Sequence, residues 1–306
     1  NGFKVSLKGA INIGTGAGME ELRDIAVSLQ PTLTNPAPLE IESKNLEEDY
    51  IQLLLSKIDL LKIKSLKVVV DAGNGMAGLL LPKLIEKLPI TIIPLFTDVD
   101  MTFPNHPADP LREETLSDLK KKVQEVNADF GVAFDGDADR IGFIDETGQM
   151  VMADLVAAFL AKELFLKDHP GTSIIYDTRS SRIVPETIEE ASGKAIQSRT
   201  GHFYVKEVMR REKAIFAAER SGHFYYQNFF YSESALLSFL YFLAAVSQAN
   251  QKVSILVNRY NKYFSTGEVN FSVLDRSPER LREIAKNFPD GKIEWFDGLS
   301  VLYDAW

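Results

Sequence analysis

The sequence contains no cysteine, which excludes disulfide frameworks, thiolate zinc sites, iron–sulfur clusters and a cysteine nucleophile. It also has no long apolar run: the most apolar stretch, residues 235–246, is interrupted by Ser238 and falls short of the ~20 residues that span a bilayer. Basic residues are in deficit, with 34 Lys and Arg against 43 Asp and Glu and a net charge of -9. This charge repels phosphodiester backbones and anionic lipid surfaces, so we expect neither a nucleic-acid nor a membrane partner.

The remaining composition is that of an ordinary globular protein. Apolar residues make up 45% and charged residues 25% of the 306 residues, which sets aside disordered and collagen-like classes. At roughly 150 residues per domain, the length indicates about two domains, with three small ones also allowed. The chain begins at Asn1 without an initiator methionine, so we expect it to be an internal part of a longer polypeptide.

Short strand-like runs, for example at residues 67–70, 130–134 and 173–176, are separated by segments with helical spacing of apolar residues. This alternation predicts an α/β fold of repeated α/β domains with mixed, largely parallel sheets. After Ser265 the pattern changes to period-two alternation at residues 267–274, which predicts a strand within a small α+β piece at the C-terminal end.

The proline-rich segment 30–40 has the composition of a linker and divides the first short α/β segment from the rest. We therefore predict four units, at residues 1–40, 41–148, 149–258 and 259–306. The glycine-rich segments at 14–18 and 71–75 lack the spacing of dinucleotide or triphosphate loops, and both are interpreted as turns.

The densest cluster of chemistry-bearing residues is Asp135-Gly136-Asp137-Ala138-Asp139-Arg140, which lies between two apolar strand-like runs. Three carboxylates this close repel one another unless a cation lies among them, and Mg²⁺ suits a few carboxylates combined with a phosphate. A calcium helix-loop-helix would explain Glu146 at the twelfth position, but Arg140 stands where that loop needs glycine. A solvated acidic turn is the remaining alternative. Arg140 also indicates a nearby anion, because guanidinium groups bind phosphate.

Two Gly-His pairs follow small polar residues, at Thr200-Gly201-His202 and at Ser221-Gly222-His223, and Glu219 precedes the second pair. Glu and Ser can hydrogen-bond sugar hydroxyls, and His can bind phosphate or move a proton. A single His is more often structural, but two such pairs at predicted element ends favour a polar site. Arg179 closely follows a predicted strand and is a candidate phosphate contact as well as a candidate surface residue.

Several motifs resemble those of the phosphohexomutases, the phosphoglucomutase and phosphomannomutase superfamily. They are Phe103-Pro104-Asn105-His106-Pro107, Ala128-Asp129, the 135–140 loop and Asp145-Glu146-Thr147-Gly148. The segment Glu219-Arg220-Ser221-Gly222-His223 resembles that family's sugar-binding loop, and Arg199-Thr200-Gly201-His202 is similar to its phosphate-proximal segment.

The resemblance implies a cytoplasmic four-domain enzyme that interconverts hexose 1-phosphate and hexose 6-phosphate through a phosphoserine and a hexose 1,6-bisphosphate. It implies that Asp135, Asp137 and Asp139 bind Mg²⁺. The substrate-binding residues that it implies are Glu219, Ser221, His223 and Arg179. The catalytic residues that it implies are Arg140, His202 and Lys4.

In that family the serine loop would precede Asn1 and a second phosphate-binding loop would follow Trp306, so we expect the first and fourth units to be incomplete and this chain alone to be inactive. Two positions depart from the family pattern: Ser232-Glu233-Ser234 stands where an acidic pair is usual, and Ala218 replaces a glycine. The alternative hypothesis is a non-catalytic sugar-phosphate or metal-binding remnant that lacks both loops. The preferred hexose, including glucosamine, and the oligomeric state stay open.

Overall fold

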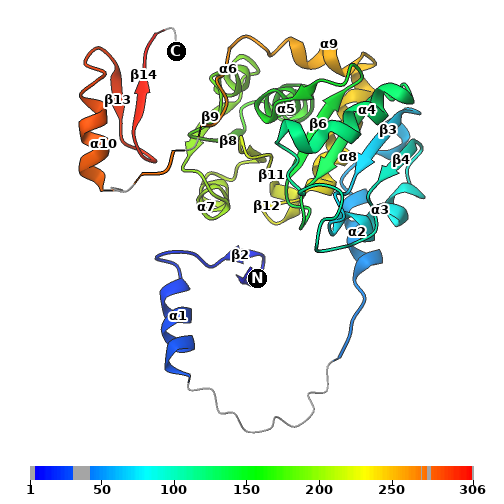
Figure 1. Ribbon diagram of the computed structural model, residues 1–306, viewed down its shortest axis with the longest axis horizontal. Helices are drawn as coiled ribbons and strands as arrows, with labels where there is room; N and C mark the ends of the chain where they lie inside the picture. The colour runs from blue at the N-terminus through cyan, green and yellow to red at the C-terminus, as the bar shows by residue number, and fades with distance from the viewer. Residues whose placement is uncertain (1–3, 30–41, 270, 274–276, 305–306) are drawn as a thin grey trace.

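The computed structural model describes residues 4–29, 42–269, 271–273 and 277–304, and two five-stranded mixed sheets form its body (Figure 1). The strands of the first sheet are β3 (Lys67–Asp71), β4 (Thr91–Leu95), β5 (Phe130–Phe134), β6 (Ile141–Asp145) and β7 (Met150–Val151). Those of the second are β8 (Ser173–Asp177), β9 (Lys194–Ser198), β10 (Phe216–Ala218), β11 (Phe224–Tyr226) and β12 (Ser232–Glu233). The predicted α/β class with mixed sheets is confirmed.

The two sheets repeat one topology. Their strand orders are β4-β3-β5-β6-β7 and β9-β8-β10-β11-β12, so corresponding strands occupy corresponding places. In each sheet the first two pairings in that order are parallel and the last two are antiparallel. The turn after β5 and the turn after β10 are therefore equivalent, and both lie at the carboxyl edge of the parallel strands, where α/β folds bind ligands.

Helices cover both sheets. They are α2 (Glu47–Leu55), α3 (Ala77–Ile85), α4 (Ser117–Glu125), α5 (Ala153–Leu160), α6 (Ile183–Glu190), α7 (His202–Glu212), α8 (Ala235–Ala249) and α9 (Val253–Asn258). Short helical turns lie at Leu60–Lys62, Glu113–Leu116 and Gln227–Phe229, and a π-helical turn, Ala161–Leu166, continues α5. Within the ranges that the structure describes, no helix is both long and apolar enough to cross a membrane.

One apolar core joins the two sheets through α8. Phe242 of α8 packs against Phe143 of the first sheet, with ring centroids 4.2 Å apart, and Tyr241 packs against Tyr226 of the second sheet at 4.8 Å. All four side chains belong to one cluster of buried residues. Because each buried aromatic side chain contributes roughly 1.5–3 kcal/mol, this shared core holds the two sheets in a fixed relation.

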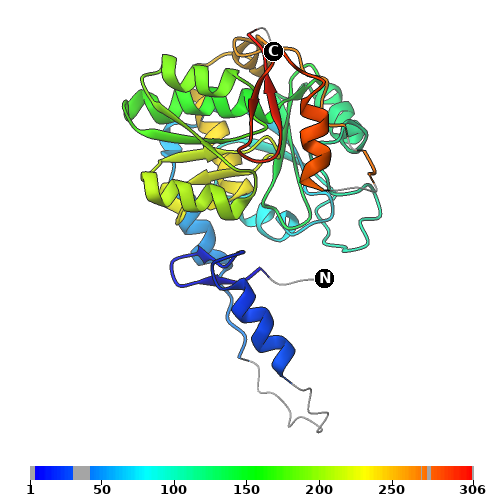
Figure 2. The same cartoon turned by 90° about the vertical axis from the view of Figure 1, so that its left-hand side faces the viewer.

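The N-terminal piece consists of the strands β1 (Ser6–Leu7) and β2 (Ile11–Asn12) and the helix α1 (Met19–Ser28), and it lies to one side of the body (Figure 2). None of the residues of α1 is buried. The piece contacts α7, where Arg210 donates hydrogen bonds to the carbonyl oxygens of Gly9 and Ala10. The predicted linker at residues 30–40 lies outside the described residues.

The C-terminal piece contains α10 (Pro278–Ala285) and the antiparallel strands β13 (Lys292–Glu294) and β14 (Ser300–Leu302). The predicted strand at 267–274 is wrong for residues 267–269 and 271–273, which form no strand and are exposed, while residues 270 and 274 lie outside the described part. Alternation is not sufficient for a strand, which also needs hydrogen bonds to a neighbouring strand, and these six residues pair with none of the described strands. The unit boundaries at 40, 148 and 258 stay predictions.

Candidate functional site

The turn between β5 and β6 brings the three predicted metal ligands together. One carboxylate oxygen from each of Asp135, Asp137 and Asp139 lies within 4.8 Å of the others. Asp135 is buried at the end of β5, and its Oδ1 accepts hydrogen bonds from the backbone N–H groups of Asp139 and Arg140 at 3.0 and 3.1 Å. The buried strand β5 thus fixes the position of Asp135. The hydrogen bonds to the Asp135 carboxylate stabilise the turn that carries Asp137 and Asp139.

Positive groups surround these carboxylates. Lys4 Nζ lies 2.6 Å from Asp137 Oδ2 and 2.5 Å from Asp139 Oδ2, and Arg140 Nε donates to Asp135 Oδ2 at 2.8 Å. Burial lowers the pKa of Lys4, but its hydrogen bonds to Asp137 and Asp139 outweigh burial and raise that pKa above its ordinary value.

The two inner carboxyl groups shift in opposite directions. Burial and then the charge of Asp139 raise the pKa of Asp135. Burial also acts to raise the pKa of Asp139, but the hydrogen bonds from His223 and Lys4 prevail and hold it well below its usual range. Lys4, Arg140 and His223 all contact these carboxylates, so positive charge stabilises the turn. Carboxylate oxygens are hard donors, which suit Mg²⁺.

The turn between β10 and β11 carries the predicted sugar-binding residues 219–223, here called the sugar loop. It contacts the turn of residues 135–140 between β5 and β6, here called the metal loop. His223 Nε2 lies 3.3 Å from Asp139 Oδ1, and its Nδ1 lies 2.8 Å from Ser221 Oγ. The N–H of Ile141 donates to the carbonyl oxygen of Gly222 at 3.2 Å. Gly222 has φ +81°, and a Cβ there would lie 3.0 Å from the Ile141 carbonyl oxygen, so glycine permits this close approach of the two loops.

Glu219 links the sugar loop to the first Gly-His segment. Its carboxylate is buried, and Oε1 accepts a hydrogen bond from the N–H of Gly201 at 2.7 Å, while Tyr225 donates its hydroxyl hydrogen to Oε2. His202, the first residue of α7, is half-exposed, and its Nδ1 lies 4.0 Å from Glu233. The structure therefore joins Gly201 to Glu219 and places the His202 ring beside a different carboxylate.

Arg179 follows β8, and its Nε donates to Asp177 Oδ2 at 3.2 Å. Asp177 is fully buried and also accepts from Ser180 Oγ at 2.6 Å and from the N–H of Arg220 at 3.3 Å. The sequence did not predict a role for Asp177, and it placed Arg220 in the sugar-binding loop without a role of its own. A signal existed, because Asp71 ends β3 as Asp177 ends β8, but the repeat is visible only in the strand order.

A cavity of about 740 Å³ opens beside the two loops. Four arginines contribute to its lining: Arg112, Arg140, Arg179 and Arg220. Ser221 also lines it, as do the acidic residues Asp109, Asp154 and Glu268. Concentrated guanidinium groups in a protein of net charge -9 favour a phosphorylated ligand.

The C-terminal piece contacts the site through Asp297, which was not predicted from the sequence. Asp297 Oδ2 accepts a hydrogen bond from the N–H of Thr200 at 2.7 Å, and Arg199 Nε donates to Oδ1 at 3.2 Å. The loop between β13 and β14 thereby holds the segment that begins α7.

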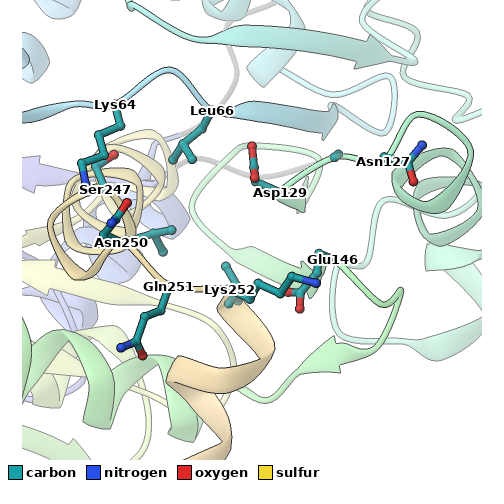
Figure 3. Close-up of a pocket in the computed structure, with 12 residues that line it drawn as sticks. Lys64, Leu66, Asn127, Asp129, Glu146, Ser247, Asn250, Gln251 and Lys252 are labelled. Atoms are coloured by element: carbon teal, nitrogen blue, oxygen red, sulfur yellow. The ribbon is translucent and has the colours of Figure 1, made fainter.

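A second cavity, of about 440 Å³, lies at the opposite edge of the first sheet (Figure 3). Its lining comes from Lys64 and Leu66 before β3, from Asp129 before β5, and from Asn250 and Lys252 between α8 and α9. Since these positions flank the amino ends of the parallel strands, the cavity belongs to a different part of the molecule from the metal and sugar loops.

Comparisons with known proteins agree with this arrangement. Residues 48–148 match the family model of phosphoglucomutase/phosphomannomutase, alpha/beta/alpha domain II, and residues 152–263 match that of domain III. A phosphomannomutase of Methanocaldococcus jannaschii is 35% identical over 307 residues, which cover 98% of this chain and 66% of the relative. Phosphohexose mutases of Xanthomonas campestris (strain B100) are 33% identical over 308 residues, 100% of this chain and 68% of the relative.

A crystal structure of a phosphoglucomutase/phosphomannomutase family protein from Burkholderia thailandensis superimposes with a TM-score of 0.77 at 34% identity, covering 86% of this chain and 56% of that one. The chain spans about two thirds of the length of the curated relatives that it matches. The sequence, the fold and the matched domain models agree, and the chain belongs to the phosphoglucomutase/phosphomannomutase superfamily, the phosphohexomutases.

Proposed function

We propose that the protein containing this chain is a cytoplasmic phosphohexomutase that interconverts hexose 1-phosphate and hexose 6-phosphate, with mannose, glucose or both as the sugar. The observation that carries the proposal is the contact between Asp139 of the metal loop and His223 of the sugar loop, beside an arginine-lined cavity. A site that combines a cation-binding turn, hydroxyl-binding side chains and guanidinium groups suits a sugar that carries phosphate.

Asp135, Asp137 and Asp139 are the proposed Mg²⁺ ligands. The donor set fits this ion, since it offers three carboxylate oxygens within 4.8 Å of one another, and the exposed Asp137 leaves the turn accessible. When bound, Mg²⁺ supplies positive charge that offsets the charge of a phosphoryl group in transfer.

Arg140 and Arg179 are proposed to bind and orient phosphate oxygens from the wall of the cavity, with Arg220 beside them. Glu219 accepts and Ser221 donates hydrogen bonds to ring hydroxyls, and the two residues lie in one tight turn, where the N–H of Gly222 donates to the Glu219 carbonyl oxygen at 3.1 Å. Phosphoryl transfer depends mainly on positioning and charge, and the fixed turn supplies positioning.

The remaining candidates have supporting roles. Lys4 is proposed to neutralise phosphate charge beside the metal loop. His223 contacts both Ser221 and Asp139, and it is proposed to fix the position of the Ser221 hydroxyl relative to the Asp139 carboxylate. His202 is proposed to lie near phosphate at the start of α7. The proposed phosphoryl donor is a phosphoserine, and the proposed intermediate is a hexose 1,6-bisphosphate. The proposed domain limits are those predicted from the sequence, at residues 40, 148 and 258.

The test uses the complete gene product, including whatever precedes and follows this chain. Mannose 1-phosphate and glucose 1-phosphate are supplied with Mg²⁺, and formation of the 6-phosphates is followed by ³¹P NMR. We expect turnover of at least one substrate, a large loss of kcat in Asp137→Asn, and little change in the control Asp168→Asn, which alters an exposed carboxylate outside the site. Binding of the sugar phosphates without turnover of either one would favour the non-catalytic alternative.

A further inference from the structure

Tyr225 lies in the middle of β11, where successive side chains face opposite sides of the sheet. Phe224 and Tyr226 belong to the core that joins the two sheets, whereas Tyr225 belongs to a smaller core with Val205 and Met209 of α7. The Tyr225 side chain is 0% exposed. Its ring is therefore held between the second sheet and α7, and only its hydroxyl group reaches a polar partner.

That partner is Glu219, to whose Oε2 the Tyr225 hydroxyl donates a hydrogen bond. The N–H of Gly201 donates to Oε1 at 2.7 Å, and His223 Nδ1 lies 3.6 Å from Oε2. The Glu219 carboxylate is thus held at both oxygens by groups of two different elements. Each carboxylate oxygen has two lone pairs, so each can still accept a hydrogen bond from a ligand hydroxyl.

The ionisation behaviour of Tyr225 agrees with this geometry. Burial, and then the negative charge of Glu219, raise the pKa of Tyr225 well above its ordinary value. The hydroxyl group therefore remains a hydrogen-bond donor throughout the working pH range of an enzyme, and the contact does not alternate with a repulsive phenolate.

We propose that Tyr225 is a positioning residue that fixes the Glu219 carboxylate in the orientation in which it receives a sugar hydroxyl. The inference rests on the proposed function, because Glu219 is the proposed hydroxyl acceptor. Without the Tyr225 hydroxyl, Oε2 loses its protein donor and the carboxylate can rotate about its terminal bond. Binding of the sugar would then have to restore the lost order.

The test compares Tyr225→Phe with Tyr226→Phe in the complete gene product. Tyr226 is the matched control, since it is also 0% exposed and its hydroxyl donates to Ser238 Oγ at 2.8 Å on the opposite face of the sheet. We expect Tyr225→Phe to raise KM for the hexose phosphate about tenfold, the loss of one hydrogen bond to a charged group, with kcat within about twofold of wild type. Tyr226→Phe should leave KM unchanged. It should lower thermal stability, because the hydrogen bond to Ser238 is lost.

A double-mutant cycle shows whether Tyr225 acts through Glu219. If it does, adding Tyr225→Phe to Glu219→Gln should raise KM by much less than it does in the wild type. Equal KM increases in Tyr225→Phe and Tyr226→Phe, or additive effects in the cycle, would overturn the inference while the mutase proposal stands. A wild-type protein that neither binds nor converts the hexose phosphates would overturn both.

Discussion

The buried carboxyl group of Asp154, near the start of α5, should destabilise the folded protein at neutral pH. Its side chain is 2% exposed, and neither carboxylate oxygen accepts a hydrogen bond of normal geometry. The positive charge of Arg220 and the backbone of Ser181 favour the ionised form of Asp154, but burial outweighs them. Burial raises the pKa of Asp154 from 3.8 to about 6. At about 1.4 kcal/mol per unit, this difference corresponds to roughly 3 kcal/mol.

The folded and unfolded chains differ in the protonation of Asp154 over one pH window. Below pH 3.8 the carboxyl group is protonated in both the folded and the unfolded chain and has no effect. Between pH 3.8 and about 6 the folded chain retains the proton that the unfolded chain releases, so rising pH favours unfolding. Above that window both forms are ionised and the full destabilisation is present.

The assay is urea unfolding of wild type and Asp154→Asn at pH 4 and pH 7. The amide keeps the shape and removes the ionisation. The variant should therefore gain about 2.4 kcal/mol relative to wild type between the two pH values, slightly less than the full shift, because the unfolded wild type is already partly ionised at pH 4. Asp177→Asn is the matched control, because Asp177 is equally buried but accepts hydrogen bonds from Ser180, Arg179 and Arg220. It should lower stability at pH 7 by about 1.5–3 kcal/mol. An Asp154→Asn difference that does not change with pH would refute the reasoning.

Three further predictions concern the metal loop and the C-terminal contact. Asp137→Asn should weaken Mg²⁺ affinity by about tenfold or more in a calorimetric titration, and unchanged affinity would remove the metal assignment. Lys4→Met should instead strengthen Mg²⁺ binding by about tenfold, because the ammonium group competes for Asp137 and Asp139; Lys8→Met, an exposed control, should not. Asp297→Ala should speed hydrogen exchange at the Thr200 amide, whose acceptor it removes, and an unaltered rate would contradict that contact.

Much of the fold could be predicted because its signals are local. Continuous apolar runs end at polar turns, and the strands expected at 130–134 and 173–176 are present as Phe130–Phe134 and Ser173–Asp177. The clustering of the three carboxylates was predictable for the same reason, since they are neighbours in the sequence. The roles of all the candidate residues, the proposed metal ligands included, stay predictions, because they depend on a ligand.

The remainder depends on contacts between distant segments. The short strands β7, β11 and β12 were missed, since two or three residues carry too little periodicity to distinguish a strand from a turn. The hydrogen bonds of Tyr225 to Glu219 and of the Thr200 amide to Asp297 depend on the order of the strands and on packing. No spacing of residues in the sequence indicates these contacts. The strand expected at 267–274 is the opposite case, a strand that was predicted but is absent from the described residues of that range. Alternation alone does not provide a neighbouring strand with which to pair.

The repeated strand order explains how two turns far apart in the sequence form one site. Each turn joins the third and fourth strands of its sheet, so the two turns are equivalent, and they meet where Ile141 donates to Gly222. Their separation depends on how the two sheets are packed, and Phe242 of α8 contacts the first sheet within the core that both sheets share. Because the proposed phosphoryl transfer depends on the placement of charges, we expect the packing of α8 to influence the geometry of the candidate site, although α8 contributes no candidate residue to it.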